Sequence, residues 1–328
     1  MAKGGNRRVM KNIFALERLV RLSNHLDSIG AYSVSDRIDS ILKSAMPLSD
    51  TEREQLGQNA EGSKYKYINE EEWGVLRPML VDQKPSSSYV ETEDFKYDPE
   101  LTAYTPGETL DLLSNPKVLE WFDKIKSYKI PSEYKHIILV PCAASKPWGA
   151  SCPGSGKYYK AYHDIKKQLK EEDKLAFWVT ISEPLGIVPE DMWDSFPGYD
   201  VPGLFKNRSQ QFGGIQSRDY AKLFGETRIP PFDKKAYRES IRILGNVIGS
   251  FIMNNSQPDR KWISFVKGTK GKVTTHTDML RDALSFLEGK GVNINHSSHT
   301  KAVDEKGVRP TRENVYEHVY DILQDELV

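Results

Sequence analysis

The sequence predicts a three-layer α/β/α domain with a mostly parallel central sheet, preceded by a small helical hairpin and a polar linker. Two observations predict this fold class. From residue 106 onward, short apolar strand segments alternate with amphipathic helical segments, which is the pattern of β-α-β units. Four of the strand segments also run directly into polar loops, as parallel strands do at the sheet edge where ligands bind.

The N-terminal part of the chain predicts an accessory region rather than a catalytic one. Apolar residues recur at helical spacing up to Gly30, and Ser33 is a suitable N-cap for a second helix, so residues 1–47 are expected to form a helical hairpin. Residues 48–105 are polar and are expected to form a linker, with helical turns around residues 70–80.

Residues 106–328 carry the predicted α/β catalytic domain. Apolar periodicity predicts helices at 107–127, 157–171, 233–254, 275–288 and 311–326. Apolar runs bounded by turn residues predict strands at 137–141, 178–182, 261–267 and 291–295.

The composition of the chain restricts the kinds of protein that it can be. The chain has 328 residues, 38% of them hydrophobic, which is enough to fill a substantial core. Lys plus Arg and Asp plus Glu are balanced at 46 each, so binding to nucleic acid would require a local basic face. The two cysteines, Cys142 and Cys152, cannot form a disulfide framework or a four-cysteine zinc site. No apolar run approaches the roughly 18 residues of a membrane span, so a cytoplasmic protein without a membrane partner is expected.

The first strand ends in the loop that begins at Pro141 and runs to Trp148. Lys146 lies between Ser145 and Pro147, and the proline stiffens the loop, so the lysine can bind a phosphate or a carboxylate in the crevice. A solvated loop lysine is the alternative. Cys142 ends the strand and is either a small core residue or a nucleophile.

The second strand ends at Ser182 and Glu183, and Asp200 follows in a turn. Two carboxylates in a cleft suit general acid–base work or nucleophilic attack on a sugar carbon. Glu183 directly precedes Pro184 and Asp200 lies two residues before Pro202, and turn chemistry alone explains residues in such segments.

The third strand ends at Lys267, and Lys270, Lys272 and the start of a helix follow it. Lys267, Lys270 and Lys272, with His276, are expected to grip phosphate groups, and Asp278 is a further carboxylate for the site. The spacing is not that of a Walker A motif, so ATP hydrolysis is not expected. The last strand ends at an HxxH pair that has no further ligands beside it, so neither a metal site nor a cofactor is predicted.

Three motifs in order resemble a known family. Cys142, Lys146 and Ser151 are spaced as PCxxxKP-aromatic-xxS, and the segments 182–189 and 199–202 follow. Together they resemble the signature domain of archaeosine synthase and its relatives in the tRNA-guanine transglycosylase-like group. The resemblance covers residues 135–205. Gly154 stands where the family pattern has a histidine, and the cysteine-rich zinc site of the transglycosylases has no counterpart here.

The resemblance implies a nucleic-acid base-modifying enzyme with DNA or tRNA and a free 7-deazaguanine base as partners. The leading hypothesis is guanine exchange in DNA, as in bacterial and phage transglycosylases, with Asp200 or Asp278 as nucleophile and Lys146 or Glu183 assisting. One alternative is addition to the nitrile of 7-cyano-7-deazaguanine, which archaeosine synthase joins to lysine in tRNA. Another is a non-enzymatic nucleic-acid-binding or virion-associated protein. The residues expected to bind the base are Cys142, Ser145, Trp148, Ser151, Ser182, Leu185 and Gly186.

The lysine loop makes a testable prediction about salt. If Lys267, Lys270 and Lys272 contact phosphates, nucleic-acid affinity should fall steeply with ionic strength, because binding releases counterions. Replacing each lysine by alanine should lower the slope of log affinity against log salt by about 1. An affinity that does not change with salt would exclude phosphate contacts by this loop.

Overall fold

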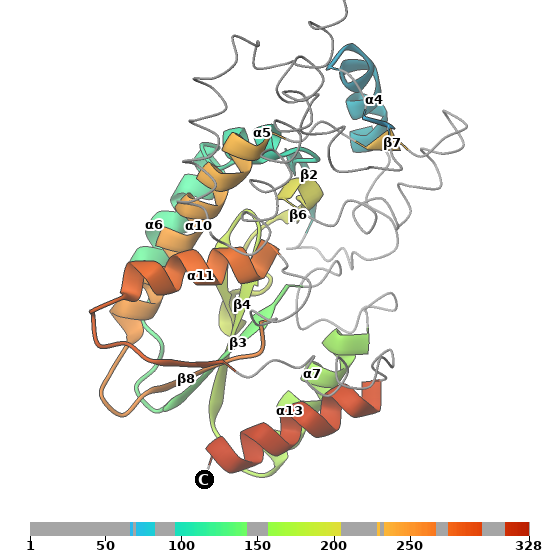
Figure 1. Cartoon of the computed structure of the whole chain (residues 1–328). Coiled ribbons are helices and arrows are strands. Elements are labelled where there is room, and N and C mark those ends of the chain that lie inside the picture. The colour runs from blue at the N-terminus through green and yellow to red at the C-terminus, as the bar shows by residue number, and fades with distance from the viewer. Residues whose placement is uncertain are drawn as a thin grey trace, which may run out of the picture. The chain divides into compact units, whose positions relative to one another are not determined.

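The computed structural model describes part of the chain, in eight ranges (Figure 1). Contacts divide the chain into two units, Met1–Lys66 and Tyr67–Val328, and nearly all described residues belong to the second unit. The hairpin predicted at residues 1–47 lies outside the described residues. The described ranges are 66–67, 70–82, 96–142, 157–204, 228–229, 233–266, 275–296 and 312–327.

The described elements follow the predicted order closely. The strands are β1 (Lys66–Tyr67), β2 (Tyr97–Thr102), β3 (His136–Pro141), β4 (Ala176–Ser182), β5 (Gly186–Pro189), β6 (Gly198–Asp200), β7 (Arg228–Ile229), β8 (Lys261–Ser264) and β9 (Ile294–His296). The α-helices are α4 (Glu70–Asp82), α5 (Pro106–Leu112), α6 (Pro116–Ser127), α7 (Lys157–Glu171), α10 (Lys234–Asn255), α11 (Thr275–Leu287) and α13 (Arg312–Glu326), and short 3-10 turns span Glu190–Met192 and Pro202–Leu204.

A five-stranded sheet forms the centre, with strand order β5-β4-β3-β8-β9. β3 pairs in parallel with β4 on one side and β8 on the other, and β8 pairs in parallel with β9. β5 turns back from β4 and pairs with it antiparallel. The predicted mostly parallel sheet is therefore confirmed.

The two faces of the sheet are covered by different helices, which confirms the three layers. Ile137 and Leu139 of β3 face the core formed with α5, α6, α10 and α11. Ile138 and Val140 face the second core, formed with α7 and α13. All four side chains are fully buried, which explains why this parallel strand is apolar throughout rather than alternating. Figure 1 shows α10 and α11 on one side of the strands and α7 and α13 on the other.

The prediction of a single helix at 107–127 is wrong, because the structure has two helices there, α5 and α6. Asn115 caps α6, and its side-chain oxygen accepts a hydrogen bond from the backbone N–H of Lys117 at 2.9 Å. Pro116 has no N–H and disfavours a helical residue before it, so α5 cannot continue through this point. The break between α5 and α6 was not predicted, because the hydrophobic periodicity continues through it.

The last residues of the predicted linker are part of the folded domain. β2 pairs in parallel with β6, outside the five-stranded sheet, and Leu101 and Ala103 are fully buried. The segment Tyr97–Thr102 was assigned to a linker because its sequence, YDPELT, is mostly polar and too short for a clear strand pattern.

α10 and α11 pack closely because α10 presents glycines to α11. A Cβ atom added at Gly245 would lie 2.6 Å from the Cβ atom of Asp282, and one added at Gly249 would lie 2.5 Å from the ring of Phe286. Both distances are shorter than van der Waals contact. The approach of the two helices therefore depends on the missing side chains.

We predict that Gly245→Ala lowers the free energy of unfolding by about 1–3 kcal/mol, because overpacking outweighs the roughly 1 kcal/mol that alanine gains in helix propensity. Gly74→Ala in α4 is the control, since nothing lies within 4 Å of the added Cβ atom. It should leave stability unchanged or raise it by up to about 1 kcal/mol. Chemical denaturation measures both, and a Gly245→Ala protein as stable as the wild type would contradict the packing argument.

Candidate functional site

Three side chains meet at the carboxyl edge of the sheet. Cys142 follows β3, Glu183 follows β4, and His276 lies in the first turn of α11, which follows β8 in the chain. The Sγ atom of Cys142 lies 3.2 Å from Nε2 of His276 and 3.9 Å from Oε2 of Glu183. The same Glu183 oxygen lies 3.2 Å from Nε2 of His276. The edge that the sequence predicts as the site therefore holds a compact polar cluster.

Backbone and side-chain hydrogen bonds fix the segments that carry the cluster. The N–H of Cys142 donates to the carbonyl of Ile181 at 2.8 Å, which extends the β3–β4 pairing past the end of β3. On the helix side, the hydroxyl of Thr275 donates to the carbonyl of Leu204 at 2.6 Å. Each segment is thus held beside its neighbour before any ligand binds.

The cluster is electrostatically unusual because it is buried. The side chains of Glu183 and His276 are only 4% and 8% exposed, whereas Cys142 is half-buried. Burial by itself lowers the pKa of His276, but the nearby Glu183 and Cys142 outweigh it and raise that pKa well above its ordinary value. The two neighbours therefore favour positive charge at the centre of the cluster.

Asp278 lies close in sequence to His276 but on another side of α11. Residues two apart on an α-helix point about 200° apart, so the two side chains diverge. The Asp278 side chain is fully buried and accepts a hydrogen bond from the hydroxyl of Tyr237 on α10. Arg281 approaches its other oxygen at 3.7 Å. The structure brings Glu183 together with His276, and it does not bring Asp278 into this cluster.

Asp200 lies in β6, in the two-stranded sheet with β2 rather than in the five-stranded sheet. Tyr97 and Tyr104 are its neighbours: burial raises the pKa of both tyrosines first, and the charge of Asp200 raises both further. Its assignment as a nucleophile stays a prediction.

The residues of the second loop that were assigned to base binding pack into the protein. The hydroxyl of Ser182 lies 2.5 Å from that of Tyr199. Leu185 is 1% exposed and its carbonyl accepts a hydrogen bond from the indole N–H of Trp121 at 3.2 Å. Gly186 has a φ of +71°, a conformation that favours glycine. These contacts shape the loop beside Glu183, and a contact of these residues with a base stays a prediction.

Several predicted site residues lie outside the described residues, so their roles also stay predictions. They are Ser145, Lys146, Trp148, Ser151, Lys267, Lys270 and Lys272.

One further cation was missed by the sequence analysis. Lys234 opens α10 one turn before Tyr237, and burial together with the nearby Arg238 lowers its pKa to about 7. No signal in the sequence could have found it, because a lysine at the start of an amphipathic helix is typical of a solvated position.

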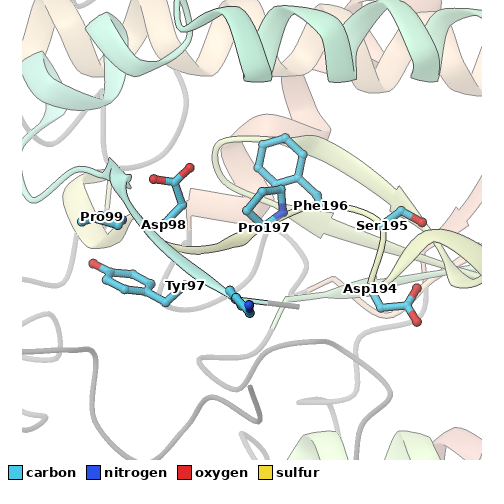
Figure 2. Close-up of a pocket in the computed structure, with 8 residues that line it drawn as sticks. Tyr97, Asp98, Pro99, Asp194, Ser195, Phe196 and Pro197 are labelled. Carbon is cyan, nitrogen blue, oxygen red and sulfur yellow. The ribbon is translucent and has the colours of Figure 1, made fainter. Parts of the chain in front are cut away.

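A separate pocket lies between the start of β2 and the segment before β6 (Figure 2). The two carboxylates of its lining, Asp98 and Asp194, oppose the binding of phosphate, and Asp98 is already paired with Lys117 at 2.6 Å. The pocket therefore suits a nucleic-acid backbone poorly. Its lining residues are Lys96, Tyr97, Asp98, Pro99, Asp194, Ser195, Phe196 and Pro197.

The fold and the cluster define an α/β protein with a polar site at the carboxyl edge, where the helices that follow β3 and β8 cover opposite faces of the sheet. Comparison with known proteins adds a distant relationship. A family model described as a domain of unknown function (DUF5591) matches residues 118–212. The α subunit of archaeosine synthase from Thermoplasma acidophilum is 23% identical over 141 residues, which cover 39% of this chain and 26% of that protein. No solved structure matches. Among the described helices, none combines the length and the apolar composition that a membrane-spanning helix requires.

We predict that the Tyr237–Asp278 hydrogen bond stabilises the fold. Tyr237→Phe removes the hydroxyl that donates to a fully buried carboxylate, so the free energy of unfolding should fall by about 1.5–3 kcal/mol. Tyr128→Phe is the matched control, because its hydroxyl donates to Asp191 at 2.8 Å near the surface, where the loss should stay below about 1 kcal/mol. Equal losses in the two variants, measured by urea denaturation, would contradict a structural role specific to Asp278.

Proposed function

We propose that this protein is an enzyme that modifies a 7-deazaguanine base carried by nucleic acid, with Cys142, Glu183 and His276 at its reacting centre. The observation that carries the proposal is that two residues of the cluster lie in the motifs that resemble archaeosine synthase. Cys142 and Glu183 belong to the first two of the three motifs that resemble archaeosine synthase, and the family match at 118–212 spans both. Those motifs end two adjacent parallel strands, so their side chains meet in space.

Addition to the nitrile of 7-cyano-7-deazaguanine is the reaction that the geometry supports best. Such a reaction needs polar groups that act together on one carbon and one nitrogen atom, and the cluster offers three such groups within hydrogen-bonding range. It also agrees with the name of the relative, archaeosine synthase. Guanine exchange by Asp278 is disfavoured, because this carboxylate lies outside the cluster, is fully buried and accepts a hydrogen bond from Tyr237.

Guanine exchange is a second candidate because of Glu183. This carboxylate lies at the carboxyl edge within the cluster, where a nucleophile for a sugar carbon would be needed. In either reaction the target base must leave the base stack, because a buried cluster cannot reach a base inside a duplex.

An assay with defined oligonucleotides tests the proposal and separates the two reactions. In the first arm, DNA and RNA oligonucleotides that contain 7-cyano-7-deazaguanine are incubated with the protein and either lysine or ammonia. In the second arm, oligonucleotides that contain guanine are incubated with the free deazaguanine base. Mass spectrometry of the nucleosides reads both arms, and DNA and RNA are scored separately.

We expect a mass gain on the cyano base in the first arm. Glu183→Gln and Lys146→Ala should each lower its rate by roughly 100-fold or more, because each removes a charged group expected to act on the reacting base. Glu239→Gln is the control, since this carboxylate is exposed and pairs with Arg242 on the surface of α10. Product in the second arm alone would support guanine exchange instead. No change of any base in either arm would overturn the proposed function.

A further inference from the structure

The arrangement of the cluster is that of a metal site rather than of a proton relay. In a nucleophile–histidine–carboxylate chain, the two partners bind the two different nitrogens of the imidazole. Here Cys142 and Glu183 both approach the same nitrogen, Nε2 of His276, at 3.2 Å each. The three atoms form a closed triangle, completed by the 3.9 Å separation of sulfur and carboxylate oxygen.

We propose that Cys142, Glu183 and His276 bind a divalent transition-metal ion, most favourably Zn²⁺. Within the described ranges, their ligand atoms all lie within 4.8 Å of one another. A tetrahedral zinc ion with Zn–S near 2.3 Å and Zn–N and Zn–O near 2.0–2.2 Å places its ligand atoms about 3.3–3.6 Å apart. The observed separations of 3.2, 3.2 and 3.9 Å surround that range, so an ion can enter with little movement of the side chains.

The number of ligand atoms favours a metal ion over a proton at this position, and the charge of the ion is compatible with burial. One proton on Nε2 forms a single well-directed hydrogen bond, whereas a metal ion interacts with the sulfur, the nitrogen and the oxygen at once. A Zn²⁺ ion with one thiolate, one carboxylate and one neutral imidazole also gives a cluster of zero net charge. That matters because the Glu183 and His276 side chains are only 4% and 8% exposed, and uncompensated charge is costly there.

The ligand set identifies the class of metal and the kind of site. A thiolate and an imidazole favour zinc and similar transition metals over Mg²⁺ or Ca²⁺, which prefer oxygen ligands. Three protein ligands leave a fourth position for water or for a group of the substrate, as catalytic zinc sites do. The site joins the ends of two parallel strands to the first turn of α11, and the bonds at Cys142 and Thr275 hold these segments in place.

This metal site is not visible in the sequence, because the three ligands are 41 to 134 residues apart and form no local motif. The inference does not depend on the proposed reaction, since metal binding can be measured without a nucleic-acid substrate. A failure of the base-modification assay would leave it standing, and the reverse also holds.

Metal binding by the full-length chain tests the inference. After chelator treatment, Zn²⁺ binding is measured by titration calorimetry, and Co²⁺ is added to follow the thiolate-to-cobalt charge-transfer absorbance. We expect one metal ion per chain and a charge-transfer band. Cys142→Ser should abolish the band, and Cys142→Ser, His276→Gln and Glu183→Gln should each weaken Zn²⁺ binding by about 10-fold or more. Cys152→Ser, which changes the other cysteine of the chain, is the matched control and should keep both signals.

A second measurement needs no variant and covers the case in which a substitution prevents folding. Zn²⁺ should protect Cys142 of the wild-type protein from alkylation, as found by mass spectrometry of its peptide, because a metal-bound thiolate reacts slowly. The inference is overturned if the wild-type chain binds no stoichiometric Zn²⁺ or Co²⁺. It is also overturned if Cys142→Ser keeps the charge-transfer band, or if Zn²⁺ leaves the alkylation of Cys142 unchanged.

Discussion

Parallel pairing of β3 with β4 on one side and β8 on the other is the constraint on which the site depends. Because the three strands run in the same direction, their carboxyl ends meet at one edge. The pairing continues one residue beyond β3, through the N–H of Cys142, and this places the thiol beside the segment that carries Glu183. α11 then supplies His276 from the connection after β8. Any change of register between β3 and β4 would separate the thiol from the carboxylate.

The position of His276 depends on how α11 is rotated about its axis. Two hydrogen bonds contribute to that rotation: Thr275 is bonded to the carbonyl of Leu204, and Asp278 is bonded to Tyr237 on α10. The close approach of α10 and α11 at Gly245 fixes the distance between the helices. We therefore interpret Asp278 as a residue that orients the helix, while His276, on another side of the same turn, faces the cluster. The packing of α10 against α11 in the core therefore helps to determine where His276 lies in the cluster.

Much of the fold could be predicted from the sequence, because its signals are local. The apolar runs at 137–141 and 178–182 and the periodic helices at 157–171 and 275–288 lie within a few residues of the observed elements. The short strands β2, β5 and β6 could not be predicted from the sequence, because they are strands through pairing with other segments rather than through their own composition. The break before Pro116 was visible in the sequence, but continuous apolar periodicity outweighed it.

The candidate site was predicted in its location more fully than in its chemistry. Cys142, Glu183 and His276 were each singled out because they follow strands, yet they were assigned to three different tasks. Sequence spacing does not show which atoms of distant loops converge. His276 and Asp278 are only two residues apart on α11, and the sequence alone does not show which of them faces the site. Leu185 illustrates the same limit, because only the fold reveals that its side chain fills the core while its carbonyl binds Trp121.

A crystal structure of the protein with an oligonucleotide that carries 7-cyano-7-deazaguanine would show whether the cluster is the reacting centre. We expect the base to lie at the carboxyl ends of β3 and β4, with its nitrile facing Cys142, Glu183 and His276. A base bound elsewhere, for example in the pocket beside Asp98 and Phe196 (Figure 2), would contradict the assignment of this cluster as the reacting centre.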